Sequence, residues 1–234
     1  PHELTARPEP AAQGDVVLVE TGAAPLSASL DGAVPFYREG DRWVALVGID
    51  AEARPGRRDL RVRWEDGEAT LRFEVRAKAF PTERLRVEPR YVEPPAEVAA
   101  RIAAEKARLD RLWERRSPER RWQGGFRRPV PAEPSSAFGL QRVFNGQRRS
   151  PHNGVDFPVG AGIPVAAANA GEVAVAEDLY FTGNTVIVDH GLGLYTTYAH
   201  LSEIEVRVGQ PIAAGTIVGR VGATGRATGP HLHW

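Results

Sequence analysis

The chain has 234 residues, its 30 basic residues balance 30 acidic ones, and 42% of its residues are hydrophobic, as in a globular protein. This length favours two globular units over one. A neutral chain lacks the positive field of a general nucleic-acid binder, so we expect no nucleic-acid partner. It has no cysteine and no apolar run of about 18 residues, which excludes disulfides, thiolate metal sites and a membrane-spanning helix.

The N-terminal third has the pattern of an all-β domain. Residues 1–13 carry three prolines and no apolar periodicity, and they predict a tail. Residues 14–79 contain short apolar or alternating runs separated by turn signals such as Asp31-Gly32 and Asp66-Gly67. This spacing is typical of a β-sandwich, and we predict an immunoglobulin-like (Ig-like) sandwich over 14–79.

A linker is predicted over residues 80–122. Its first part is punctuated by prolines, and apolar residues then recur with helical spacing from Val98 to Trp113. The pattern predicts one helix at about 96–115, for which Pro94 and Pro95 suit the start.

The remainder of the chain, residues 123–234, predicts a second all-β domain. From Phe138 onward it consists of short strand-like runs bounded by glycines, and nothing in it has helical period. The glycines between Gly209 and Gly225 are interpreted as tight turns rather than a phosphate cradle, because no helix follows them.

Four histidines in this part of the chain indicate a metal site. His231 and His233 are two residues apart, so a strand would point both imidazoles to one face. His152 precedes Asp156 by four residues, and His200 follows a strand-like run. Zinc that activates water needs three protein ligands and an open fourth position, and two histidines with one aspartate are a suitable set. The two remaining histidines would be free for proton transfer.

The order of these motifs resembles the lysostaphin/LytM-type zinc metallopeptidases, which cut the peptide cross-links of peptidoglycan. The resemblance runs from about Phe138 to Trp234 and rests on an ordered set of motifs, which makes it specific. The matching segments are Phe138-Gly139, the HNGVDF segment from His152, Gly162 to Val165, Gly183 to Gly191, the YAHLS segment at His200, and Val221 to Trp234.

The resemblance implies roles for five residues. His152, Asp156 and His233 would bind zinc (Zn2+), and His200 and His231 would be the catalytic pair beside it. One of the pair would act as general base, and the other would stabilise the oxyanion or protonate the leaving amine. Which residue takes which role stays open. His190, at a turn, is interpreted as structural.

The resemblance also implies the wider context of the chain. The expected fold is a two-sheet β catalytic domain with a groove, preceded by a small β-domain as in exported members of the family. The expected partners are peptidoglycan stem peptides, the expected bond is a D,D-type cross-link, and the expected place is the bacterial periplasm or cell envelope. The chain starts at Pro1 without a signal-peptide pattern, and we expect its C-terminus to be truncated after Trp234. The arginine-rich run of residues 115–128 is interpreted as an edge of the groove that holds carboxylates.

Two other functions remain open. The first is a non-hydrolytic LytM-type activator of a peptidoglycan amidase, although such activators typically lose zinc ligands that this chain retains. The second is a wall-binding module in which the Ig-like unit does the work. A further hypothesis is intramolecular inhibition, in which the N-terminal half or the segment 80–115 lies against the groove.

Overall fold

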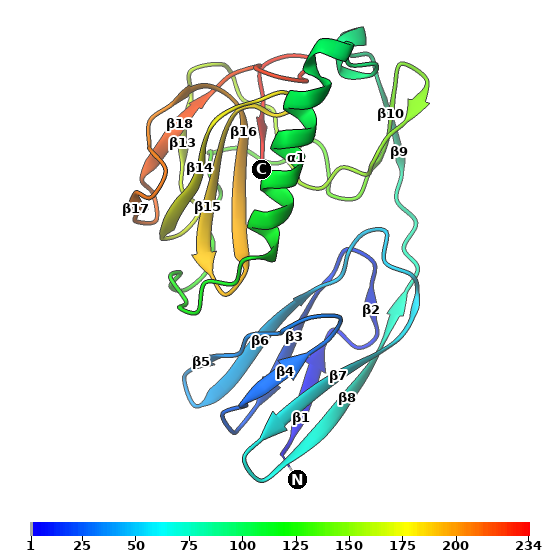
Figure 1. The fold of residues 1–234 in the computed structure, drawn as a ribbon, viewed down its shortest axis with the longest axis vertical. Helices are drawn as coiled ribbons and strands as arrows, with labels where there is room; N and C mark the ends of the chain where they lie inside the picture. The colour runs from blue at the N-terminus through cyan, green and yellow to red at the C-terminus, as the bar shows by residue number, and fades with distance from the viewer. Residues whose placement is uncertain (1) are drawn as a thin grey trace. The chain divides into compact units, whose positions relative to one another are not determined.

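A computed structural model describes residues 2–234. The chain divides into two compact units, the first ending at Phe80 and the second spanning Pro81–Trp234. Strands make up most of the regular structure, and within residues 2–234 the one α-helix is α1 (Ala99–Glu114) (Figure 1). The predicted mainly β fold class is therefore confirmed.

The first unit is a sandwich of two four-stranded sheets. Side chains of alternating strand positions, such as Val17 and Val19 from one sheet and Leu60 and Val62 from the other, meet in one apolar core. One sheet has the order β1 (Leu4–Arg7), β3 (Val16–Thr21), β6 (Arg42–Gly48), β5 (Tyr37–Glu39). The other has the order β2 (Ala11–Ala12), β8 (Gly67–Arg76), β7 (Gly56–Trp64), β4 (Ser27–Ser29).

The prediction of a tail is wrong for residues 2–13, and Pro1 lies outside the described residues. Strand β1 pairs antiparallel with β3, and β2 pairs parallel with β8. Ala11 is buried in the core, and His2 Nε2 lies 2.7 Å from Asp66 Oδ1. These are edge strands of a few residues, where proline is tolerated and apolar alternation is weak. The pairing depends on partners far along the chain, so the local pattern did not reveal it.

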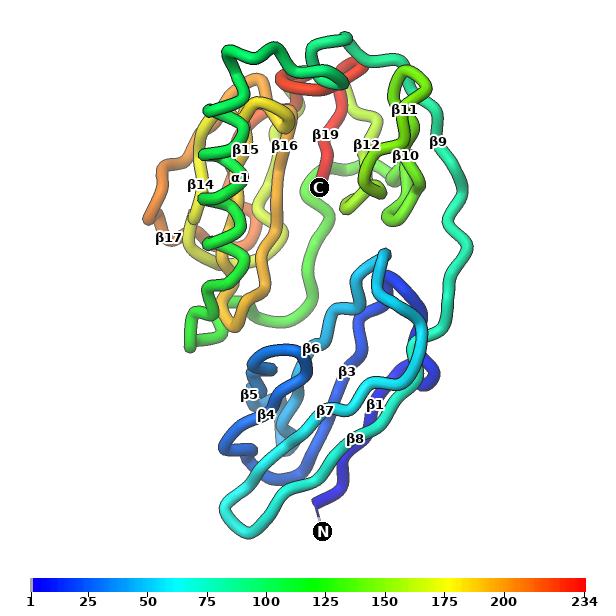
Figure 2. Tube along the Cα trace, turned by 45° about the vertical axis from the view of Figure 1, so that its right-hand side comes forward, coloured from blue at the N-terminus to red at the C-terminus, as the bar shows by residue number. Residues whose placement is uncertain are grey.

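The second unit contains two sheets (Figure 2). Its core is formed by apolar residues of the larger sheet, among them Tyr198, Leu201 and Leu232. The small sheet has the order β11 (Gln147–Arg148), β10 (Gln141–Phe144), β9 (Thr82–Leu85). The larger has the order β12 (Asp156–Phe157), β19 (Leu232–His233), β16 (Leu194–Ile204), β15 (Gly183–Gly191), β14 (Gly171–Leu179), β17 (Pro211–Ile212), with β18 (Ile217–Val221) on β16 and β13 (Pro164–Ala166) on β18.

The predicted linker over 80–122 is in fact part of the second unit. Strand β9 pairs parallel with β10, about 60 residues later in the sequence. Two short 3₁₀-helices follow, η1 (Pro89–Tyr91) and η2 (Ala96–Val98), and the second leads directly into α1. The catalytic-domain boundary predicted at residue 123 therefore lies too late, because the compact unit begins at Pro81.

Helix α1 is anchored to the larger sheet by both apolar and charged contacts. Leu112 is buried against Val175 and Ile187 in a small separate cluster. Arg101 Nη2 lies 2.8 Å from Asp178 Oδ2 on β14, which fixes the other end of the helix. The helical periodicity of the sequence thus reflects a face that packs on the sheet.

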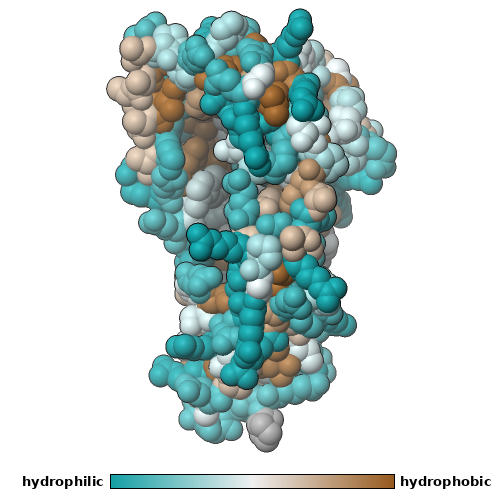
Figure 3. All heavy atoms as spheres, turned by 90° about the vertical axis from the view of Figure 1, so that its right-hand side faces the viewer, coloured by the Kyte–Doolittle hydropathy of each residue, from teal (hydrophilic) through white to brown (hydrophobic). Residues whose placement is uncertain are grey.

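The surface shows no extended apolar region on the face drawn in Figure 3. Hydrophilic side chains cover most of that face, and apolar side chains show between them in separate patches. The exposed large apolar residues come from scattered positions, such as Leu26 in the first unit and Val208 in the second. Within the described residues, none of the helices has the length and apolar character that crossing a membrane requires.

Candidate metal centre and active site

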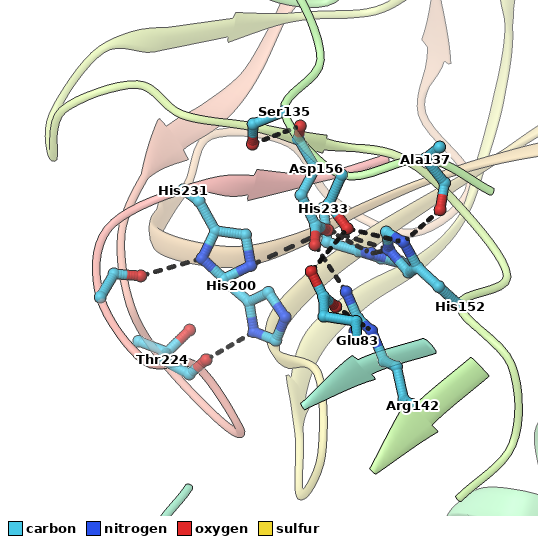
Figure 4. Close-up of polar contacts among 12 residues, drawn as sticks. Glu83, Ser135, Ala137, Arg142, His152, Asp156, His200, Thr224, His231 and His233 are labelled. Carbon is cyan, nitrogen blue, oxygen red and sulfur yellow. Dashed lines mark hydrogen bonds and ion pairs between the residues drawn. The ribbon is translucent and has the colours of Figure 1, made fainter. Parts of the chain in front are cut away.

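The five residues singled out in the sequence come from three neighbouring strands and one loop. His233 on β19 pairs with Asp156 on β12 and with Ala199, next to His200, on β16. Leu232 is fully buried in the core, so the alternation of the strand turns His231 and His233 to the opposite face. His152, in the loop before β12, completes the group (Figure 4).

Three side-chain atoms of this group form a nearly equilateral triangle. His152 Nε2 lies 3.1 Å from Asp156 Oδ1 and 3.0 Å from His233 Nδ1, and the latter two atoms are 2.9 Å apart. Tetrahedral zinc with bonds of about 2.0–2.1 Å separates its ligand atoms by about 3.3 Å. The three atoms therefore lie only slightly closer together than the ligand atoms of a bound zinc ion would.

The hydrogen bonds behind His152 fix which nitrogen faces the triangle. Its Nδ1 lies 2.9 Å from the Ala137 carbonyl oxygen, a partner to which it can only donate, so Nε2 presents a lone pair. A lone pair cannot donate to the carboxylate of Asp156. Acceptors that face one another this closely are held favourably by a cation between them, so the residues present fit a metal.

Asp156 is held in its ionised form by its neighbours. Burial opposes ionisation, but the imidazoles of His152 and His233 close to Oδ1 outweigh it and hold the pKa of Asp156 well below its usual range. Its second oxygen, Oδ2, accepts a hydrogen bond of 2.6 Å from Arg142 Nη2, and Arg142 is held in turn by Glu83. This chain of contacts leaves Oδ1 free to face the two imidazoles.

His200 and His231 form a second pair next to the triangle. His200 Nδ1 donates to the Thr224 carbonyl at 2.8 Å, and His231 Nδ1 donates to the Gly229 carbonyl at 2.9 Å. Both Nε2 atoms are then free for a ligand, and the two ring centroids lie 4.7 Å apart. Burial, together with the neighbouring His231, lowers the pKa of His200 to about 3, so this imidazole is neutral at neutral pH.

The backbone of His200 is itself unusual. Its φ of 61° lies in the left-handed region, which side chains other than glycine rarely adopt. The residue sits where β16 changes partner, from β19 at Ala199 to β18 at Leu201. Strain of this kind is retained where the surrounding structure fixes it, and it often marks functional sites.

Gly154, within the HNGVD segment, allows this loop to approach β19. A Cβ at this position would lie 2.5 Å from the Trp234 carbonyl oxygen and 2.8 Å from His233 Cε1. Val155 and Trp234 exchange two backbone hydrogen bonds on either side of this contact. The glycine is therefore required for the loop that carries His152 to lie against His233.

Two adjacent cavities of about 230 and 210 Å³ open around the five residues. His200, Arg142 and Arg226 line both of them, and Arg149 lines the second. Sequence reasoning missed these three arginines. Only Arg226 carried a signal, because it lies within the matched segment Val221 to Trp234.

The arginine-rich run of residues 115–128 does not line either cavity, so the prediction that it edges the site is wrong. Arg121 donates its backbone N–H to His190 and pairs with Asp189, at the end of β15 remote from Gly183. Strand β15 runs its full length between this contact and the active site. The basic run therefore ties the segment after α1 to the far end of the sheet.

His190 is a packed core residue. It is fully buried, and its two ring nitrogens lie 2.7 Å from the Ala170 carbonyl and 2.7 Å from Thr196 Oγ1. Burial lowers its pKa, which favours the neutral imidazole. Both nitrogens are engaged within the fold.

Comparisons of the sequence and of the structure with known proteins point to the same family. The sequence profile of peptidase family M23 matches residues 150–234. A crystal structure of an M23 peptidase from Pseudomonas aeruginosa is 37% identical, and its superposition covers 97% of this chain and 89% of that chain with a TM-score of 0.79. The chain therefore belongs to peptidase family M23, which confirms the resemblance to lysostaphin/LytM-type peptidases.

Named relatives are similar over a shorter stretch. The peptidoglycan DD-endopeptidase ShyA of Vibrio cholerae is 42% identical over 101 residues, which are 43% of this chain and 24% of that protein. The DD-carboxypeptidase/endopeptidase Mpg of Neisseria meningitidis is 40% identical over 83 residues, 36% of this chain and 19% of that protein. The matched part of the chain thus spans about a quarter or less of these relatives.

Proposed function

We propose that the chain is a zinc-dependent endopeptidase that hydrolyses peptide cross-links of bacterial peptidoglycan, of the D,D type, outside the cytoplasm. The observation that carries the proposal is the triangle of His152, Asp156 and His233 with His200 and His231 beside it. A complete set of ligands and proton-transfer groups favours hydrolysis over a non-hydrolytic activator. The activities for which ShyA and Mpg are named support the substrate class.

In this proposal the ligand triangle holds the metal, and the rest of the site moves protons. His152, Asp156 and His233 would hold the zinc, which would supply Lewis-acid polarisation of the scissile carbonyl and activation of water. His200, which is neutral at neutral pH, accepts the proton of the attacking water at Nε2. His231 Nε2 donates a hydrogen bond to the substrate oxygen as negative charge develops there, or a proton to the leaving amine.

Three contacts outside the reacting atoms keep these groups in place. Arg142 holds Asp156 Oδ2, so that Oδ1 stays directed at the imidazoles. The Thr224 and Gly229 carbonyls hold the Nδ1–H groups of the catalytic pair, which keeps each Nε2 directed into the site. Such supporting contacts fix the tautomer and the ring orientation before substrate binds.

Digestion of purified sacculi tests the proposal. The zinc-loaded chain and a His152→Ala control are incubated with sacculi, and the muropeptides are analysed by mass spectrometry. We expect the wild type alone to convert cross-linked dimers into monomers, with masses that identify a D-alanyl bond as the one cut. Unchanged dimers in both samples would contradict the endopeptidase activity, and cleavage of another bond would contradict its D,D type.

A further inference from the structure

Arg226 has an exceptional position in the active site. Its backbone N–H donates to the Phe181 carbonyl at 2.8 Å, and its guanidinium lies 4.7 Å from the ring centroid of Phe144 and 5.0 Å from that of Phe181. The side chain is only partly exposed, and it lines both cavities together with His200. Two aromatic rings thus hold the plane of the guanidinium at the edge of the catalytic pair.

The positive charge of Arg226 is not neutralised within the second unit. Throughout residues 2–234, no side chain or carbonyl forms a hydrogen bond or an ion pair with its guanidinium. Burial, with Arg142 and Arg149 nearby, lowers the pKa of Arg226 to about 10, which still leaves it protonated at neutral pH. Partly buried arginines are normally paired, so this one lacks a partner.

The two neighbouring arginines differ in how they are satisfied. Arg142 is paired with Asp156 and Glu83. Arg149 binds only the neutral oxygens of Val92 and Gln147, and its buried Nε has no hydrogen-bond partner in the described part of the chain. Arg149 lines the same 210 Å³ cavity as Arg226. Two of the guanidinium groups that line this cavity are therefore not paired with a carboxylate in the described part of the chain.

An anion of the substrate is the partner that this arrangement lacks. The planar fork of arginine matches a carboxylate in two parallel hydrogen bonds, whereas glycine bridges offer no charge at all. We propose that Arg226, assisted by Arg149, binds a free carboxylate of the stem peptide next to the scissile amide and so determines specificity. The proposal rests on the peptidoglycan endopeptidase function proposed above, and it narrows the substrate.

The substrate class that satisfies this contact is a D-alanyl amide formed with the amine of a diamino dicarboxylic acid. In such a cross-link the carbon that bears the amide nitrogen also bears a free carboxylate, a few bonds from the carbonyl that is attacked. His200 lies at the boundary of both cavities, so a substrate carbonyl at the catalytic pair brings that carboxylate towards Arg226. Amidation of the carboxylate would remove the charge and one acceptor oxygen.

A pair of matched substrates tests the proposal. The substrates are two purified dimers with a D-alanyl–diaminopimelate cross-link. In one the carboxylate beside the scissile amide is free, and in the other it is amidated. The zinc-loaded full chain is incubated with each, and the rate of cleavage is measured. A charge-assisted hydrogen bond is worth roughly 10- to 100-fold in rate. We expect the wild type to favour the free acid by about this factor in kcat/KM, and Arg226→Gln to reduce the ratio to about one.

Two further variants separate specificity from folding. Arg207→Gln removes an exposed arginine that lines neither cavity, and we expect it to keep the wild-type ratio. Arg226→Lys keeps the charge but loses the fork, and we expect an intermediate ratio. Zinc content and the melting temperature are measured for each variant, and calorimetric titration with the free-acid and amidated cleavage products reports binding without turnover.

The outcomes distinguish the two proposals. Equal cleavage of both dimers by the wild type, or an undiminished ratio in a folded Arg226→Gln, would overturn the role of Arg226 and leave the endopeptidase activity standing. Failure of the wild type to cleave either dimer and sacculi would overturn the proposed function and this inference with it. Loss of the preference for the free acid in Arg226→Gln, with unchanged zinc content and melting temperature, would support both the role of Arg226 and the endopeptidase activity.

Discussion

His231 and His233 flank the buried Leu232, yet their environments separate the roles proposed for them. His233 Nδ1 belongs to the triangle of candidate ligand atoms, whereas His231 Nε2 stays 3.9 Å from Asp156 Oδ1 and its ring lies tilted against that of His200. The division into ligands and proton-transfer groups can therefore be tested at single side chains.

Removal of a ligand and removal of a proton-transfer group should give different losses. We expect His152→Ala to lose bound zinc, because the triangle then keeps two of its three atoms. His200→Ala and His231→Ala should keep stoichiometric zinc and lose roughly 10²- to 10⁴-fold in turnover. Elemental analysis of the purified variants, beside muropeptide release, makes the comparison. Zinc content near zero in His231→Ala would contradict the division.

Gly154 offers a test of how the metal site is assembled. A methyl group in Gly154→Ala would meet the Trp234 carbonyl and the His233 ring, so that ring must shift. We expect zinc affinity to fall by roughly 10- to 100-fold, as when a supporting contact of a metal ligand is lost. Gly160→Ala is the matched control, because nothing lies within 4 Å of its Cβ position. Equal zinc affinity in both variants, measured by competition with a chelator, would refute the explanation.

At the scale of the elements, helix α1 is an integral part of the second unit. Leu112 packs on Val175 and Ile187, and the ion pair between Arg101 and Asp178 joins the helix to β14. The helix covers apolar side chains of the sheet that water would otherwise reach.

Leu112→Ala measures this contribution. We expect the second unit to lose about 2–4 kcal/mol of unfolding free energy, because the substitution leaves a cavity against the sheet. Arg111→Ala, at the exposed neighbouring position, should change it by less than about 0.5 kcal/mol. Urea denaturation followed by circular dichroism gives both values. A loss below about 1 kcal/mol in Leu112→Ala would mean that the helix packs only weakly.

At the scale of the whole molecule, the two large cores of the described residues share no residue. One is built from residues up to Val75 and the other from Val130 onward. We expect two separable unfolding transitions in calorimetry, because each core is a cooperative unit of its own. Leu60→Ala should lower the transition of the first unit and leave that of the second. One transition that shifts as a whole would show that the units unfold together.

Inhibition of the enzyme by the N-terminal half stays a prediction, and the structure changes how it should be tested. Trimming residues 1–120 would also remove β9 and α1, which belong to the second unit. A deletion that ends at Phe80 spares both elements. We expect it to raise the release of monomers from sacculi, and unchanged release would contradict inhibition by the first unit.

The sequence by itself determined the mainly β fold and the approximate position of most long strands, and it singled out the five candidate residues that the structure brings together. Alternation and glycine boundaries are local properties, so β14, β15 and β16 were visible without any partner. The five residues were found because each lies in a motif of short range, such as His231-Leu232-His233. The periodicity of α1 was equally visible, although its packing partner was not.

Only the tertiary structure decided what depends on partners distant in the chain. The pairing of β1 with β3 shows that the predicted tail belongs to the first unit. The pairing of β9 with β10 shows that the predicted linker belongs to the second unit. The tertiary structure also decided which arginines line the site. Arg142 and Arg226 meet there from segments more than 80 residues apart. The arginine-rich run instead contacts the opposite end of the sheet, at His190. Hydrogen bonds between strands and charges that meet across loops follow from spatial proximity, and no local pattern encodes that proximity.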